Sequence, residues 1–477
     1  MFCQLETLRQ CLPQSVRRTL NELPVSLDET YERVMMNIMK CKQAHAYRML
    51  QCLTVATRPL SVAELAELLA FDFDAAKGGI PRLNSNWQWG DHEQAILSTC
   101  SSLITVVPGP KFPVVQFSHF SVKEFLMSDR LASSTGDISQ YHISLTNAHT
   151  VLAQACLGVL LQDHDPDVPN GTDNASLTGY AAEHWVAHVQ VENVASRVRG
   201  GMEILFDPEK PYFESWVQLH DFDADFKYTK DPESGARRLY YAALCGLHEL
   251  VEHLTLKFPQ CTSAWGGRRG TALHSASDRG HLQVVRTLLL HGVSVDVRGF
   301  WNRPPLMFAS VRGHHSIVQC LLDHGADVNS HDDGFLTALT LAAYFGHPDV
   351  VRVLLEHDTD VNSKDKYGST PLHYALEGYE HALEGYEPQT KGSYLEVVRL
   401  LLGHDANPNA QNSYGKTPLH EVARWGLESD FDVARVLLDH GADVDVEDKK
   451  GNAPLQVALG RGDVEIAQLF RSGSAQT

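Results

Sequence analysis

Residues 337–361 have the sequence TALTLAAYFGHPDVVRVLLEHDTDV, and variants of this unit recur along the second half of the 477-residue chain. Each unit begins with Thr-X-Leu or a close variant, continues through small residues and Gly-His, and then becomes an apolar segment. A degenerate unit begins near Arg237. Successive spacings are 33, 33, 33, 47 and 36 residues, because the units start at Thr271, Pro304, Thr337, Thr370, Thr417 and Ala453. A near-constant period of this length predicts stacked structural repeats.

The residue types within a unit predict two helices. A leading Thr caps the first helix, and Pro fits its first turn because the missing N–H is not needed there. Apolar residues at helical spacing in the second helix bury against neighbouring units, which favours a solenoid. The Thr-Pro-Leu-His segments at 370–373 and 417–420 make the pattern resemble the ankyrin repeat. The resemblance implies an ankyrin repeat domain of about seven repeats at 236–474.

The 47-residue spacing contains a duplication, since ALEGYE at 375–380 recurs at 382–387. We expect the insertion, at 376–393, to lie between a first helix at 371–375 and a second at 395–402. A longer loop costs little conformational entropy. A tolerated extension of the turn is therefore the favoured interpretation, and a partner-contacting loop carrying Tyr379 and Tyr386 is the alternative.

The first half of the chain does not repeat. Helices are expected at 44–55, after Ser61 and near 91–101, followed by strands at 103–107 and 114–117 that flank Pro-Gly-Pro. The order helix, helix, helix, strand, turn, strand predicts a winged-helix domain at 44–131. A helical connector at 132–235 then leads to the repeats. The expected fold class is mainly α, with a small β wing and an α-solenoid.

Three further segments carry a resemblance to a larger family: FCQLETLRQCLPQSVRRTLNELPVSLDETYERV at 2–34, VVQFSHFSVKEFL at 114–126 and AHTVLAQACLGVLLQ at 148–162. They resemble the region after the NTPase core of fungal NACHT–ankyrin proteins, a STAND branch related to NOD-like receptors. The resemblance implies that residues 1–43 are a helical remnant following a missing NACHT core. It also implies that His119 matches a residue that senses nucleotide; capping or packing at the strand–helix junction is the alternative.

Several functions are not expected. There is no GxxxxGK[ST], GxSxG, HExxH or CxxC motif, so we predict neither an enzyme nor a bound cofactor. A net charge of −19 and few basic residues at 61–107 argue against nucleic acid. The repeats account for many of the 25 histidines, so no metal site is expected. The lack of a long apolar run argues against a membrane, and nine unpaired cysteines favour the cytoplasm, with the nucleus left open.

Basic and aromatic residues are concentrated where ankyrin repeats usually present hairpin tips and the inner face of the first helices. Arg, Trp and Tyr are the types enriched at binding hot spots. We therefore expect a concave face that binds another protein, with an acidic segment as the favoured ligand. An extra residue is expected before Thr337. The candidate positions are Arg279, Trp301, Arg303, Arg312, Tyr344, Phe345, Tyr367, Tyr414, Arg424, Trp425 and Arg461.

The predicted function is that of a non-catalytic interaction or scaffold protein. The alternative is the sensor and autoinhibitory C-terminal part of a NACHT-type receptor, with a NACHT domain in trans as its partner.

Overall fold

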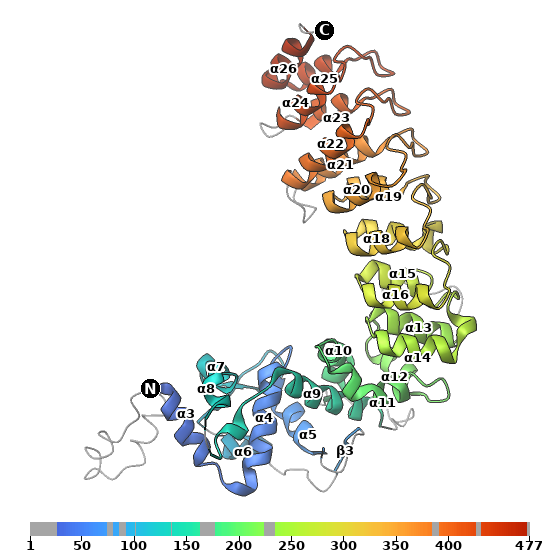
Figure 1. Cartoon of the computed structure of the whole chain (residues 1–477). Coiled ribbons are helices and arrows are strands. Elements are labelled where there is room, and N and C mark those ends of the chain that lie inside the picture. The colour runs from blue at the N-terminus through green and yellow to red at the C-terminus, as the bar shows by residue number, and fades with distance from the viewer. Residues whose placement is uncertain are drawn as a thin grey trace. The chain divides into compact units, whose positions relative to one another are not determined.

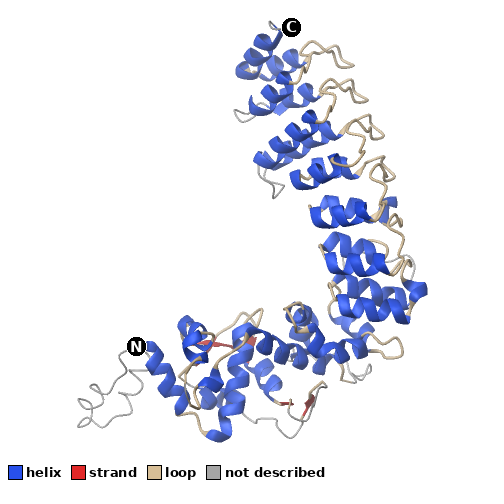
Figure 2. Cartoon of the chain, in the orientation of Figure 1, coloured by secondary structure: helices blue, strands red, loops and turns tan. Residues whose placement is uncertain are grey.

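The computed structural model describes residues 26–73, 80–84, 92–100, 102–134, 136–162, 177–223, 234–383, 391–425 and 431–474. The chain divides into two compact units, Met1–Ala224 and Asp225–Thr477. The predicted fold class is confirmed: helices dominate both units and the strands are short (Figure 2). Of the predicted 1–43 segment, residues 1–25 lie outside the described residues, and α3 (Leu27–Met36) follows them.

The first unit contains the winged helix. Its helices are α4 (Gln43–Val55), α5 (Val62–Leu69) and α6 (His92–Cys100), and its strands β1 (Leu60–Ser61), β4 (Ile104–Val107) and β5 (Val114–Phe117) form an antiparallel sheet in the order β1-β5-β4. The predicted helix–strand order is thus confirmed. Two further short strands, β2 (Phe71–Asp72) and β3 (Arg82–Leu83), pair with each other. The short helices α7 (Phe120–Leu126) and α8 (Asp129–Ala132) follow β5.

A capping box fixes the start of α5. The amide of Glu64 donates to Ser61 Oγ at 3.2 Å, and the amide of Ser61 donates to Glu64 Oε2 at 2.7 Å. Arg58 adds two hydrogen bonds to the same carboxylate, at 3.0 and 2.7 Å. Because the Glu64 side chain is buried, these bonds provide the partners that a buried carboxylate requires.

The connector helices extend the core of this unit. They are α9 (Leu145–Leu160), α10 (Leu177–Val189), α11 (Ala195–Leu205) and α12 (Tyr212–Leu219). Helix α9 packs on α4, and α10 packs on both α9 and α5. Trp185 and Trp216 are fully buried, with ring centroids 5.3 Å apart in an edge-to-face arrangement that favours aromatic pairs.

The second unit is a stack of helix pairs with its hairpin loops on one side (Figure 1). In the described residues, first helices pack on first helices of adjacent pairs and second helices on second helices. The pairs are α13 (Ser234–Leu244) and α14 (His248–Lys257), α15 (Ala272–Arg279) and α16 (Leu282–Leu290), α17 (Pro305–Val311) and α18 (His315–Asp323), α19 (Ala338–Tyr344) and α20 (Pro348–Leu355), α21 (Pro371–Leu383) and α22 (Lys391–Gly403), α23 (Pro418–Trp425) and α24 (Phe431–Asp439), and α25 (Pro454–Arg461) and α26 (Val464–Ser474).

Asparagine side chains tie successive repeats together beyond the second helices. Asn362 Oδ1 accepts from the amide of Asn407 at 2.8 Å, and its Nδ2 donates to the carbonyl of Asp405 at 3.1 Å. Asn329 and Asn409 make the same pair of bonds to the repeats that follow them. The stack is therefore joined by directional bonds as well as by apolar burial.

The predicted helix ends at the insertion are wrong. Helix α21 continues to Leu383 and α22 begins at Lys391, so the first ALEGYE copy is helical and does not lie in a turn. A Cβ at Gly378 would lie 1.9 Å from the carbonyl oxygen of Tyr344, so glycine is what allows α21 to continue at this close approach. Tyr379 is buried against Tyr394, which argues against a partner contact there. Tyr386 lies outside the described residues.

Candidate interaction surface

The hairpin tips between repeats form a continuous hydrogen-bonded row. Each tip donates a backbone N–H to a carbonyl of the preceding tip, which restricts how far one tip moves relative to the next. The donor and acceptor pairs are Phe300 and Arg269 at 3.0 Å, Asp333 and Trp301 at 3.3 Å, Lys366 and Gly334 at 3.2 Å, Ser413 and Tyr367 at 2.7 Å, and Lys449 and Tyr414 at 3.0 Å.

A carboxylate or amide side chain shapes each of the later tips. Asp365 Oδ1 accepts from the amides of Tyr367 and Ser369, at 2.9 and 2.7 Å. Asn412 accepts in the same way from the amides two and four residues after it. Gly368 adopts a left-handed φ of 73°, which closes the turn without the strain that a side chain would add.

Exposed aromatic side chains lie along this row. The tips present Trp301, Phe335, Tyr367 and Tyr414 with 57%, 52%, 50% and 63% of their surface exposed, and Trp265 precedes them in the neighbouring loop at 50%. Isolated exposed apolar residues are normal, but a row on successive repeats forms an extended apolar edge. We call Trp301, Phe335, Tyr367 and Tyr414 the tip row.

The expected extra residue before Thr337 is absent. Asp332 stands five residues before Thr337, as Asp365 does before Thr370, and it accepts the same two amide hydrogen bonds. This tip has Gly334-Phe335 where the next tip has Tyr367-Gly368, so the order of glycine and aromatic residue is reversed. Phe335 therefore takes the left-handed position, with a φ of 60°. This exchange is why Phe335 was missed, and the inverted Gly-Phe order was the available signal.

The predicted arginines are largely paired with carboxylates of neighbouring repeats. Arg303 pairs with Asp332 at 2.9 Å, and Arg312 pairs with Asp278 at 3.0 Å. Arg424 lies 2.5 Å from Glu380 of the preceding repeat and 3.4 Å from Glu421 of its own helix. The surplus of basic residues at these positions therefore overstates the positive charge of the face. Arg279 and Arg461 are exposed.

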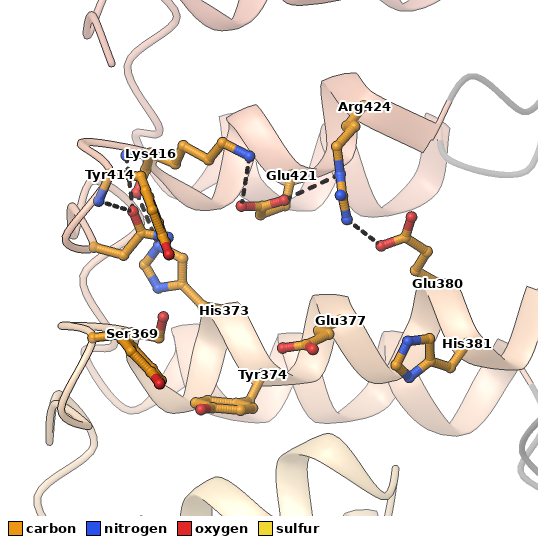
Figure 3. Close-up of a pocket in the computed structure, with 12 residues that line it drawn as sticks. Ser369, His373, Tyr374, Glu377, Glu380, His381, Tyr414, Lys416, Glu421 and Arg424 are labelled. Atoms are coloured by element: carbon orange, nitrogen blue, oxygen red, sulfur yellow. Dashed lines mark hydrogen bonds and ion pairs between the residues drawn. The ribbon is translucent and has the colours of Figure 1, made fainter. Parts of the chain in front are cut away.

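A groove of about 560 Å³ lies between α21 and α23 (Figure 3). We call it the α21–α23 groove. Tyr367 and Tyr414 line it at the tips, and Tyr374 lines it from α21. Its carboxylates are Glu377, Glu380 and Glu421, and its cations are Arg424 and Lys416, which lies 3.5 Å from Glu421. Glu377 extends from α21 toward the space between the helices (Figure 3).

Two of the remaining predicted residues, Tyr344 and Phe345, make contacts inside the repeat stack. The hydroxyl of Tyr344 and Nδ1 of His381 are 2.9 Å apart, and the rings of Tyr344 and Phe345 meet edge to face at 5.0 Å. Both Tyr344 and Phe345 are half-buried. The side chain of Trp425 lies outside what the structure describes.

Histidines of the repeats hydrogen-bond to backbone groups of their own repeat and of the next tip. His274 Nδ1 accepts from the amide of Thr271 at 3.1 Å, and its Nε2 faces the carbonyl of Arg303 in the next tip at 3.0 Å. Burial lowers the pKa of His274 to about 4, so the ring is neutral and its Nε2 carries the proton. His373 and His420 repeat this bridge. Where the structure describes the chain, no group of three His, Cys, Asp or Glu side chains is placed to hold a metal ion.

His119 caps a helix. Its Nδ1 accepts from the amide of Ser121 at 3.2 Å at the start of α7 and lies 2.6 Å from Ser121 Oγ. His119 thus makes the capping contact of the alternative interpretation, and its correspondence to a nucleotide-sensing residue stays a prediction. No helix among the described residues has the length and apolar character needed to cross a membrane.

Comparisons with known families match both units. Residues 31–136 match the winged helix domain of GPI inositol-deacylase, a type found in NACHT proteins. Residues 239–332 and 389–476 match ankyrin repeats in the three-copy form, and residues 321–375 match ankyrin repeats in the many-copy form.

A curated relative is the azaphilone pigments biosynthesis cluster protein L of Monascus ruber, which is 30% identical over 301 residues. The match covers 58% of this chain and 61% of that protein, so the chain spans less than two thirds of its relative. Among solved structures, the ankyrin repeat domain of Bcl-3 is 28% identical, with 51% of this chain and all of that chain covered and a TM-score of 0.42. The chain thus joins a winged-helix domain of a type found in NACHT proteins to ankyrin repeats, a non-catalytic protein–protein interaction module.

Proposed function

We propose that this chain is a non-catalytic scaffold protein that binds a partner polypeptide along the tip row and the adjoining concave face of its ankyrin stack. The tip row is the observation that carries this proposal. Tyr and Trp supply large contact area with little loss of side-chain entropy, which makes such a row suited to recognition. A cytoplasmic location is part of the proposal.

The backbone conformation of two tip-row residues also supports a binding role for the tip row. Trp301 and Phe335 both adopt left-handed φ angles, 56° and 60°. Such a conformation costs roughly 1–2 kcal/mol for a residue other than glycine, and strained residues cluster at functional sites. Phe335 occupies the position of Gly368 and Gly415, where glycine adopts the left-handed conformation without this cost, so a folding requirement alone does not explain an exposed aromatic ring there.

The test is capture of a partner from a cell extract by the full chain, followed by affinity measurement with the identified protein. The variant Trp301→Ala/Tyr367→Ala/Tyr414→Ala removes three rings of the tip row. We expect it to lose at least about tenfold in affinity and to keep its melting temperature, because these rings are exposed. The control Leu256→Ala/Leu290→Ala removes two exposed side chains of second helices. Equal affinity of the triple variant and the wild type would refute the proposal.

A second candidate is favoured by the first unit. His119 and Phe120 form an exposed ring pair at the start of α7, with centroids 4.4 Å apart and 71% of Phe120 exposed. The resemblance to NACHT–ankyrin proteins and the winged-helix match support a role as the sensor and autoinhibitory part of a NACHT-type receptor. A NACHT domain in trans is then the partner. Unchanged binding of a purified NACHT domain after Phe120→Ala would contradict this role for Phe120.

A further inference from the structure

The charges of the α21–α23 groove do not cancel. Glu421 is shared by Lys416 and Arg424, and Arg424 also pairs with Glu380. Tyr374 uses its hydroxyl to donate to Asp365 at 2.9 Å, outside this set. The two cations of the groove therefore form ion pairs with two of its carboxylates, and the third carboxylate is paired with neither cation.

That carboxylate is Glu377. In the described part of the stack it has no hydrogen bond or ion pair, although its side chain remains accessible to solvent. Partial burial raises its pKa; His381 opposes the shift, while Glu421 and Glu380 raise it further. The groove thus holds an anionic group that a cation would stabilise.

The groove already accommodates one guanidinium group. Arg424 lies between Glu380 and Glu421, at 2.5 and 3.4 Å from their oxygens (Figure 3). The exposed residues Tyr367 and Tyr414 line the same groove, and a planar guanidinium stacks on aromatic rings while it pairs with a carboxylate. A volume of about 560 Å³ falls within the range of sites that hold a small ligand or a side chain.

We propose that the α21–α23 groove binds an arginine side chain of the partner polypeptide, with Glu377 as its ion-pair acceptor and Tyr367 and Tyr414 as its aromatic walls. This inference rests on the proposed function, because the arginine belongs to a segment that also runs along the tip row. At this repeat the proposed partner segment is therefore basic, whereas the sequence led us to expect an acidic one. Arginine fits better than lysine because its planar fork satisfies a carboxylate and a ring face together.

The experiment selects binders from a library of random short peptides on the full chain, so that no natural partner is required. Affinities of selected peptides are measured by fluorescence anisotropy for the wild type, Glu377→Gln and the control Glu356→Gln. The control makes the same charge change at an exposed position at the end of α20. We expect selected peptides to share an arginine, to bind about tenfold more weakly to Glu377→Gln, and to bind Glu356→Gln as they bind the wild type.

A charge exchange tests the contact directly. Peptides whose shared arginine is replaced by glutamate should regain affinity on the Glu377→Lys variant. Peptides that lose affinity with the tip-row variant but not with Glu377→Gln, or that are acidic, would overturn the arginine inference and leave the proposed function standing. If the selected peptides bind the tip-row variant as tightly as the wild type, or if no binder is selected, both the arginine inference and the proposed function are overturned. Circular dichroism melts of each variant separate loss of binding from loss of folding.

Discussion

We predict that acid lowers the folding stability of the ankyrin stack through the buried histidines that bridge successive tips. His274 is fully buried, and burial lowers its pKa from 6.5 to about 4, partly offset by its hydrogen bond to the carbonyl of Arg303. In the unfolded chain the pKa returns to about 6.5, so the unfolded state binds more protons between these values. The stability that the neutral ring provides is therefore present above pH 6.5 and is lost as the pH falls toward 4.

The magnitude follows from the shift. Each pKa unit corresponds to about 1.4 kcal/mol, so a change from 6.5 to about 4 represents roughly 3 kcal/mol over the whole window. The chain itself suggests a replacement without a titrating group, because Gln456 occupies the equivalent position and its Oε1 accepts from the amide of Ala453 at 3.0 Å. His274→Gln should cost about 1 kcal/mol at neutral pH through a poorer bond to Arg303.

The assay is urea unfolding of the full chain, followed by circular dichroism between pH 7 and about pH 4.5. We expect the wild type to be more stable at neutral pH and His274→Gln to equal or exceed it near pH 5, where His274 has already cost the wild type roughly 2 kcal/mol. His291→Gln is the control, since it replaces an exposed histidine of the same repeat. Parallel loss of stability by the wild type and His274→Gln across this range would refute the reasoning.

Three further substitutions test the packing of the two units. Asn362→Ala removes hydrogen bonds to Asp405 and Asn407 and should lower the free energy of unfolding by about 1–2 kcal/mol in urea melts; an unchanged midpoint would contradict the role of this side chain as a tie between repeats. Glu64→Gln weakens the bond pair to Arg58 and should destabilise the first unit by about 2 kcal/mol, measured by its thermal transition; a change below 0.5 kcal/mol, the scatter of ordinary surface substitutions, would count against it. Phe335→Gly should keep the free energy of unfolding within about 1 kcal/mol of the wild-type value, because relief of the left-handed strain offsets the conformational entropy that glycine adds to the unfolded chain. The same variant should bind the partner more weakly. Equal affinity of the variant and the wild type would show that Phe335 does not contribute to binding by the tip row.

The fold was predictable because its signals are local and periodic. Ser61 and Glu64 stand at capping-box spacing before a run of leucines, and the structure has that box. The insertion was predicted less well because the duplicated segment was taken to extend the turn, whereas α21 continues to Leu383. Ala, Leu and Glu in ALEGYE favour a helix, and glycine is tolerated at Gly378 because the carbonyl of Tyr344 leaves no room for a Cβ.

The exposure of two tip tyrosines was predictable from the sequence, whereas the pairing of the arginines with carboxylates was not. Tyr367 and Tyr414 are recognisable from their place three residues before the Thr of the next unit, and both are exposed at tips. Arg312 and Arg424 each pair with a carboxylate of the preceding repeat, Asp278 and Glu380, which lie 34 and 44 residues earlier in the chain. A count of residue types along one face does not include such partners, because they become neighbours only when repeats stack.

Charge pairing also changes which partner suits the whole molecule. With a net charge of −19, the chain repels an acidic segment at long range, and the pairing of Arg312 and Arg424 with carboxylates reduces the positive charge of the face that would offset that repulsion. A basic segment meets the opposite conditions: the net charge attracts it, the proposed ion pair with Glu377 acts at short range, and the exposed aromatic rings of the tip row offer apolar surface. The long-range attraction from the net charge and the short-range contacts of the groove agree for an arginine-bearing partner and conflict for an acidic one, which supports the arginine proposal.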